Sequence, residues 1–161
     1  MDHVVPVIYV RAGEPARLPL IKRLFALLIA LGCLTPLVLA ANLPPSPDGL
    51  GTHTQLGLAQ CNWYRTTGLP CPSCGMTTSW AWFARGNLVA SLYIQPMGTV
   101  LALIAAGCFW GGLYVAFTGR PIYRLLRLFP GRYYFLPLLG FAILAWGWKI
   151  FIHLTGHDGW V

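Results

Sequence analysis

The amino-acid sequence predicts an all-α integral membrane protein with three transmembrane helices and one or two short amphipathic helices at the membrane interface. Charged residues make up 9% of the 161 residues and apolar residues 57%, whereas a soluble domain has roughly 25% and 45–50%. The chain also contains three long stretches that are almost free of charge. This composition excludes most soluble enzymes. It also favours membrane orientation over nucleic-acid binding as the meaning of the net charge of +7.

The three apolar stretches are each long enough to cross a bilayer, which takes about 20 residues for roughly 30 Å of hydrocarbon. The second stretch opens with Pro96, and proline is tolerated in the first turn of a helix. The third contains one cation, Lys149, whose ammonium we expect to reach the lipid headgroups. The expected segments are 1–23, a cytoplasmic N-terminal segment; 24–41, the first span; 42–95, an outward-facing segment; 96–117, the second span; 118–132, a basic cytoplasmic connection; 133–154, the third span; and 155–161, an outward C-terminal tail.

The distribution of cations predicts the orientation of these spans. Eight of the 11 lysines and arginines lie before the first span or between the second and third. Because an excess of Lys and Arg marks the cytoplasmic side, we expect the N-terminus inside and the C-terminus outside. These eight cations are Arg11, Arg17, Lys22, Arg23, Arg120, Arg124, Arg127 and Arg132.

Two alternatives in the basic regions stay open. The first span could also be a cleavable signal peptide. It has a basic start and an apolar run, and Val38-Leu39-Ala40 ends in a small residue as a cleavage site does. In the connection 118–132, Arg120, Arg124 and Arg127 recur at helical spacing. That spacing fits a short helix lying on anionic lipid as well as a plain orientation signal.

The outward segment carries the most specific pattern of the chain, the run 69–78. It contains Cys71 and Cys74, and two cysteines at this spacing can turn both sulfurs to one side. Pro72 stiffens the turn between them, and Gly75 allows a positive φ directly after it. The pattern therefore predicts either a shared metal ion or a small disulfide ring.

Two short amphipathic helices are expected after this turn, over 75–84 and 87–94. The first would place Cys74 at a helix N-terminus, where the helix dipole favours the thiolate over the thiol. The two cysteines inside the spans, Cys33 and Cys108, are expected to pack as small apolar groups. Gly107 and Gly111 would form a small-residue face for a neighbouring helix.

The run 71–78, followed by Arg85-Gly86-Asn87 and by Gln95-Pro96 before an apolar helix, resembles a bacterial "domain of unknown function" family of small membrane proteins. Those proteins are marked by a Cys-Pro-x-Cys-Gly-x-Thr motif. The resemblance covers roughly residues 65 to 115. It implies a small multi-helix protein of the bacterial inner (plasma) membrane, with the outward side in the periplasm, and it implies no reaction. Where the family commonly has an Arg, an Arg-Gly-Asp-like turn and an Asn-Pro, this chain has Thr78, Asn87 and Gln95.

A zinc ion takes four ligands, and the three outward cysteines could supply three of them. A first set lies wholly within the outward segment, and a second set draws two histidines from the outward end of the third span. The second set requires the helix to continue through Thr155 and Gly156, so that both rings face one way. The candidate ligands are Cys71, Cys74, Cys61 and His53, with His153 and His157 as alternatives.

A membrane-embedded thiol-disulfide oxidoreductase is the alternative use of Cys71 and Cys74, with Cys61 as an exchanging thiol. The outward segment is too short for a thioredoxin-type domain, and a second cysteine pair is missing. The simplest account is a structural disulfide, which would leave one of three outward thiols over.

We expect a scaffold or accessory subunit with a structural or metal-binding cysteine site, rather than an enzyme. No pair of carboxylates or phosphate-binding loop supports a hydrolytic or nucleotide-dependent reaction. The expected partners are the lipid bilayer and another membrane protein, and no nucleic acid, because three spans leave faces free for association.

Overall fold

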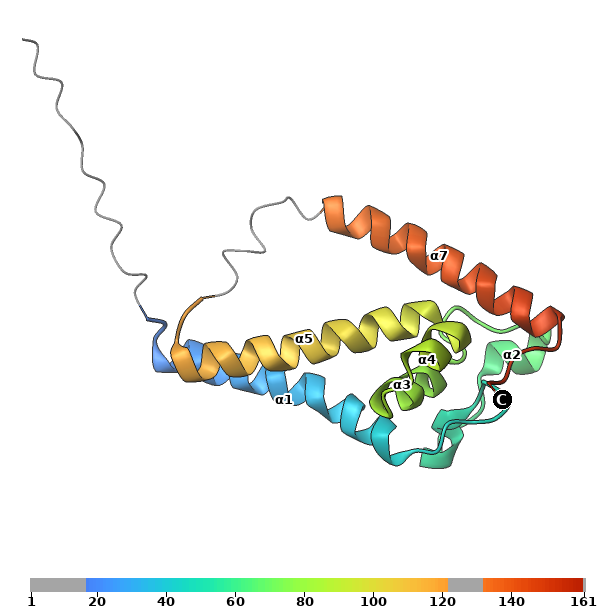
Figure 1. The fold of residues 1–161 in the computed structure, drawn as a ribbon, viewed down its shortest axis with the longest axis horizontal. Coiled ribbons are helices and arrows are strands. Elements are labelled where there is room, and N and C mark those ends of the chain that lie inside the picture. The colour runs from blue at the N-terminus through green and yellow to red at the C-terminus, as the bar shows by residue number, and fades with distance from the viewer. Residues whose placement is uncertain (1–16, 122–131, 161) are drawn as a thin grey trace, which may run out of the picture.

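The computed structural model describes residues 17–121 and 132–160, and within these ranges the chain is helical and contains no strand. This confirms the predicted fold class. Most of the basic connection, including Arg124 and Arg127, lies outside the described residues. The elements in chain order are α1 (Leu20–Asn42), the 3-10 helix η1 (Thr52–Leu56), α2 (Asn62–Thr67), α3 (Met76–Ala84), α4 (Leu88–Ile94), α5 (Pro96–Thr118) and α7 (Arg132–Leu154) (Figure 1).

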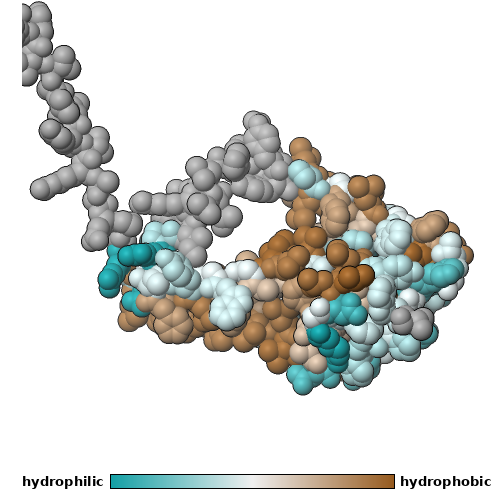
Figure 2. Space-filling model, viewed as in Figure 1, coloured by the Kyte–Doolittle hydropathy of each residue, from teal (hydrophilic) through white to brown (hydrophobic). Residues whose placement is uncertain are grey.

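Three of these helices are long and apolar enough to cross a membrane: α1, α5 and α7. Each has 23 residues, which at about 1.5 Å per residue gives roughly 35 Å. Most of their apolar side chains are exposed, so the long helices form a hydrophobic surface instead of a core (Figure 2). A membrane supplies the apolar solvent that such a surface requires.

The helices α1 and α5 lie side by side along most of their length (Figure 1). The two helices approach closely at Gly112, where an added Cβ would lie 2.8 Å from the carbonyl oxygen of Ala26 and 2.9 Å from the Cβ of Ala30. Only glycine allows the two backbones to come so close. The small-residue face expected around Gly107 does not serve this contact, because nothing lies within 4 Å of a Cβ there.

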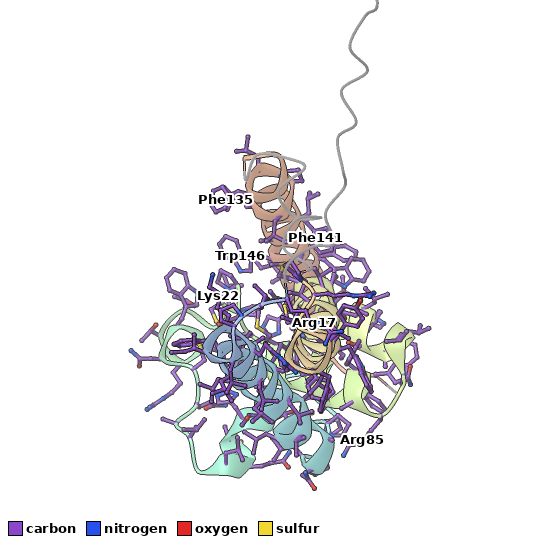
Figure 3. The ribbon with its side chains drawn as sticks, turned by 90° about the vertical axis from the view of Figure 1, so that its left-hand side faces the viewer. Arg17, Lys22, Arg85, Phe135, Phe141 and Trp146 are labelled. Atoms are coloured by element: carbon purple, nitrogen blue, oxygen red, sulfur yellow. The ribbon has the colours of Figure 1, made fainter. Side chains whose placement is uncertain are left out.

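One end of this helix pair is cationic. Arg23 donates hydrogen bonds to the carbonyl oxygens of Ala116 (2.7 Å) and Phe117 (2.9 Å), which lack helical partners at the end of α5. Figure 3 shows Arg17 and Lys22 at the same end. The short helices and the cysteines lie at the opposite end of the pair (Figure 1).

The short helices pack against α1 and α5 through a polar core. The hydroxyl of Ser79 in α3 contacts the hydroxyls of Ser91 in α4 (2.9 Å) and Thr99 in α5 (3.2 Å), and all three side chains are buried. Gly98 makes room for this cluster, since a Cβ there would lie 2.9 Å from the Ser79 Oγ. The Asn87 side chain accepts a hydrogen bond from the backbone N–H of Ala90 and caps α4.

The helix α7 diverges from the other two long helices and meets the rest of the chain near its C-terminal end (Figure 1). There Trp148 donates its indole N–H to the carbonyl oxygen of Tyr93 at 2.7 Å, and the two rings meet edge to face. The Tyr93 hydroxyl in turn donates to the carbonyl oxygen of His157. These contacts fix the end of α7 against the segment that holds the cysteines.

Candidate metal centre

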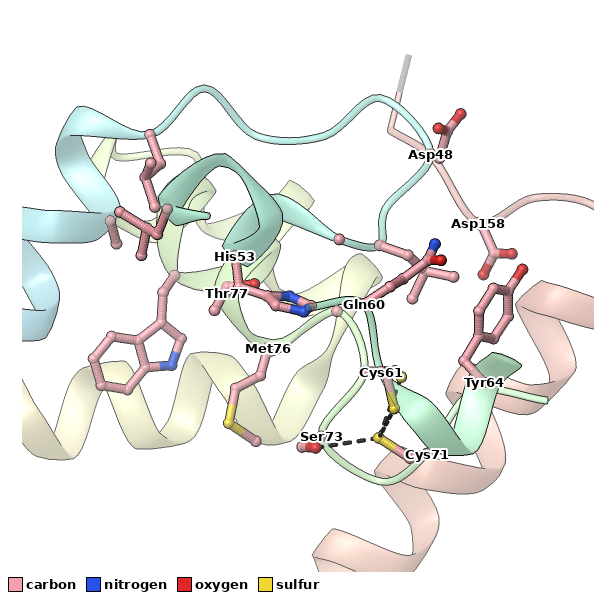
Figure 4. Close-up of a pocket in the computed structure, with 18 of the residues that line it drawn as sticks. Asp48, His53, Gln60, Cys61, Tyr64, Cys71, Ser73, Met76, Thr77 and Asp158 are labelled. Atoms are coloured by element: carbon pink, nitrogen blue, oxygen red, sulfur yellow. Dashed lines mark hydrogen bonds between the residues drawn. The ribbon is translucent and has the colours of Figure 1, made fainter. Parts of the chain in front are cut away.

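Cys61, Cys71 and Cys74 converge on one point of the molecule. Their sulfur atoms all lie within 4.8 Å of one another. The Sγ of Cys71 is central, at 3.5 Å from the Sγ of Cys61 and 3.2 Å from the Sγ of Cys74 (Figure 4). All three are free thiols and partly exposed.

The backbone around the turn explains this convergence. The N–H of Cys74 bonds to the carbonyl oxygen of Cys71 at 3.0 Å, which closes the turn. Gly75 then adopts a φ of +83° before α3 begins, and a Cβ there would lie 3.0 Å from the carbonyl oxygen of Gly49. Both the positive φ and the close approach require glycine. Cys61 comes from a separate element, as the residue that precedes α2.

Two side-chain donors from outside the turn hold its carbonyl groups. Gln95, between α4 and α5, donates to the oxygen of Pro72 at 2.8 Å. Trp146 of α7 donates its indole N–H to the oxygen of Pro70 at 2.9 Å. The cysteine turn is thus fixed from both sides, because backbone carbonyls that have no helix or sheet partner need such donors when they are buried.

The thiols of Cys71 and Cys74 differ in acidity. Burial raises the pKa of Cys71, but hydrogen bonds from Ser73 and Cys74 outweigh it and lower that pKa to about 7. Burial and the hydrogen bond with Cys71 raise the pKa of Cys74 to about 12. The expectation that the helix dipole favours the Cys74 thiolate is therefore wrong, because burial of the sulfur outweighs the dipole.

The histidines considered as ligands lie in different surroundings. His53 lines the same cleft as the cysteines, but its ring nitrogens are not part of the sulfur cluster (Figure 4). His153 places one ring nitrogen against Asp158 and the other 3.1 Å from the carbonyl oxygen of Gly68. The helix does not continue to His157, because α7 ends at Leu154 and Gly156 takes a φ of +72°. The geometry assumed for the alternative histidine pair is thus absent.

Lys149 does not extend to the headgroups, contrary to the prediction. Its side chain is 0% exposed, and its Nζ lies 3.1 Å from the Oδ1 of Asp158 in the C-terminal tail. The tail folds back across the outward segment, which brings this carboxylate to the lysine (Figure 4). An ion pair with Asp158 therefore replaces the expected contact with lipid headgroups.

The sulfur cluster opens onto a cleft of about 960 Å³. One wall is the C-terminal end of α1, with Leu39 and Leu43, and another is the start of α3, with Met76. Asp158 lines the cleft from the tail (Figure 4). The site thus combines three soft sulfur donors with access from outside, which suits the capture of a small ion.

The cysteines and the helices that follow them also carry a family likeness. Residues 61–109 match the family described as a protein of unknown function (DUF2752). The DUF2752 segment runs from Cys61 through α2, α3 and α4 into α5, and it contains all three clustered cysteines. This agrees with the resemblance to a family of unknown function. No curated protein and no solved structure matches the chain.

Sequence reasoning missed the residues outside the DUF2752 segment that complete the site. Trp146, Lys149 and Asp158 all lie far from the cysteines in sequence. The one available signal was the position of Lys149 inside an apolar span, since a charge there usually has a partner or a function. Nothing in the sequence pointed to Asp158 as that partner.

Proposed function

We propose that this protein is a small membrane scaffold or accessory subunit that binds a thiophilic metal ion, zinc first among the candidates. The ion is held by Cys61, Cys71 and Cys74. The observation that carries the proposal is the convergence of three sulfur atoms within 4.8 Å. The bound ion would lock the 42–95 segment in shape, because it joins the turn before α3 to the start of α2.

The spacing of the sulfurs supports a metal ion. Two thiolates at about 2.3 Å from a tetrahedral zinc ion are roughly 3.8 Å apart. The Sγ–Sγ separations of 3.5 Å (Cys61 to Cys71) and 3.2 Å (Cys71 to Cys74) need only a small expansion to accept an ion. A disulfide would use two of the sulfurs and leave the third without a role, whereas a metal ion uses all three.

The fourth position of a zinc ion would face the cleft. Water fills such a position in many three-ligand sites, and His53 lies in the same cleft as a protein donor. This arrangement favours an ion that can be loaded and exchanged from the outward side.

The proposed setting is the bacterial inner membrane, with the cysteine site in the periplasm. The support is the charge distribution. Arg17 and Lys22 lie together at the start of α1 (Figure 3), where Arg23 bonds to the end of α5, whereas the cysteines share a cleft with the other end of α1. An oxidising compartment would endanger free thiols, and a bound metal ion protects them. Another membrane protein is the proposed partner, since α7 leaves apolar faces of the long helices uncovered.

Elemental analysis of the purified protein tests the metal proposal. We expect about one equivalent of zinc per chain, and serine substitution of Cys61, Cys71 or Cys74 should remove most of it. The matched control is Cys108→Ser in α5, which removes a thiol far from the cluster and should leave the metal content unchanged. Metal-free wild-type protein with all three thiols alkylatable after supplementation with zinc would overturn the proposal.

A thiol-disulfide oxidoreductase is the second candidate, and one observation favours it. The pKa of Cys71 is lowered to about 7 while that of Cys74 is raised to about 12. An exchange enzyme uses this asymmetry, with an attacking thiolate and a buried partner thiol. Acid trapping of thiols in cells decides between the candidates: a mixed population of reduced and oxidised Cys71 that shifts with added reductant supports exchange, and constant reduced thiols with bound metal support the scaffold.

A further inference from the structure

Lys149 is the single fully buried charged side chain among the described residues. It lies in α7, a candidate membrane span. An ionisable residue in such a place normally has both a partner and a function. Its Nζ forms a 3.1 Å ion pair with Asp158, but the two groups are not aligned as a hydrogen bond. The ammonium is therefore held by charge and retains donors for another acceptor.

The lysine lies directly behind the cysteine turn. A Cβ on Gly75, the residue after Cys74, would lie 3.3 Å from the Cε of Lys149. Besides Cys74 from the turn, the titratable groups around Lys149 are Asp158 from the tail and His153 on its own helix, which itself contacts Asp158.

Charge balance explains why a cation belongs at this position. Three thiolates around a divalent ion leave a net charge of about −1, and a buried net charge is costly unless an opposite charge compensates it. Asp158 contacts both Lys149 and His153, so its carboxylate is not bonded to the lysine alone. The Lys149 ammonium can thus act on the sulfur cluster from behind the cysteine turn, while solvent reaches the cluster from the cleft.

We propose that the Lys149 ammonium is the counter-charge of the cysteine site, a positioning residue that offsets the net negative charge of a metal ion bound by the three cysteines. The inference rests on the proposed function, because it assigns a role toward the same three sulfurs. It also links the membrane helix α7 to the occupancy of the outward site.

The test is the zinc affinity of four proteins: the wild type, two single variants and their double variant. It is measured on the full-length protein in detergent by competition with a chelating indicator. Lys149→Met keeps the length and apolar stem of the side chain but removes the charge, and it should weaken zinc binding about 10- to 100-fold. Asp158→Asn releases the ammonium from its partner, so zinc binding should be unchanged or tighter. The double variant Lys149→Met/Asp158→Asn should bind as weakly as Lys149→Met.

Opposite effects of the two single variants distinguish a counter-charge from a merely structural ion pair. If Lys149→Met and Asp158→Asn weaken zinc binding alike, the pair only holds the tail in place and the proposal is overturned. Recovery of wild-type affinity in the double variant would overturn it as well, because the loss in Lys149→Met would then come from the unpaired carboxylate.

A second measurement separates this proposal from the metal proposal itself. In zinc-free protein, the alkylation rate of Cys74 at fixed pH should fall at least tenfold in Lys149→Met, while that of Cys61 changes little. If the wild type binds no zinc but Lys149→Met still shows this fall, the metal proposal ends and the counter-charge role stands. Equal Cys74 rates in the wild type and the variant would exclude the counter-charge whatever the zinc content.

Discussion

Cys71 and Cys74 are two residues apart in the same turn, yet their surroundings give them opposite acidities. Cys71 receives hydrogen bonds from Ser73 and Cys74 that outweigh its burial, and its pKa falls to about 7. The more deeply placed Cys74 has a pKa of about 12. Of these two thiols, Cys74 is therefore the harder one to deprotonate for metal binding, which makes its charged neighbours important for affinity.

The lowered pKa of Cys71 predicts a pH profile for its alkylation in metal-free protein. The thiolate is the reactive form, so the rate should be half-maximal near pH 7 and should fall about tenfold for each pH unit below that. Ser73→Ala removes one of the hydrogen bonds and should move the midpoint upward. Mass spectrometry after timed labelling gives the rate at each cysteine, and a midpoint for Cys71 near 9 would contradict the prediction.

The hydrogen bond from Trp146 to the Pro70 carbonyl is expected to stabilise the folded protein. Trp146→Phe removes the N–H donor of the fully buried Pro70 carbonyl, and an unsatisfied buried carbonyl costs about 1–3 kcal/mol. We expect a lower unfolding temperature and faster alkylation of Cys71 in detergent. Trp110→Phe is the matched control, because Trp110 is 69% exposed on α5. Equal unfolding temperatures for the two variants would argue against this account.

Among the helices, α1 and α5 form the one long, close helix pair of the described residues, and α7 stands apart (Figure 1). Water does not drive helix association inside a membrane, so close backbone packing at small residues must provide it. The polar cluster of Ser79, Ser91 and Thr99 joins the short helices to this pair. The helix pair thus serves as the base on which the cysteine site is built.

The close packing at Gly112 predicts that one added methyl group destabilises the α1–α5 pair. Gly112→Ala places a Cβ 2.8 Å from the Ala26 carbonyl oxygen, so the helices must separate, at a cost of about 1–3 kcal/mol. Gly107→Ala is the control in the same helix, because nothing lies within 4 Å of its Cβ. Alanine also favours a helix over glycine, so the control should be neutral or stabilising. Thermal unfolding in detergent measures both, and a Gly112→Ala protein as stable as the control would refute the close crossing.

At the scale of the whole molecule, the cluster of cations and the cysteine site lie at opposite ends of the α1–α5 pair. Cations surround the start of α1 and the end of α5, and Arg23 ties these two ends together. The sulfur cluster and its cleft lie at the other end of α1, beside Leu39 and Leu43. This polarity fixes the side of the membrane on which the site lies once the basic end is placed in the cytoplasm.

The sidedness leads to a labelling prediction in intact cells. After mild reduction and chelation, a membrane-impermeant maleimide should label Cys71 from outside, because Cys71 lines a cleft at the end of α1 opposite the basic residues. Cys33 in α1 is the internal control and should stay unlabelled until the membrane is dissolved. Labelling of Cys71 only after the cells are opened would invert the orientation and place the thiols in a reducing compartment.

The sequence by itself determined the fold class, because apolar length and the absence of charge are local properties that a bilayer converts directly into helices. It also showed that Cys71, Cys74 and Cys61 could share a site, since their residue types and spacing can be read along the chain. It failed where contacts join distant segments. The sequence assigned Lys149 to the headgroups and predicted a thiolate at Cys74.

Only the tertiary structure decided these points. Burial sets the acidity of Cys74, and burial depends on what α7 and the tail place around the turn. Asp158 reaches Lys149 because the tail folds back across the outward segment. Such pairings depend on the path of the whole chain, and a single sequence contains no periodic pattern that encodes them.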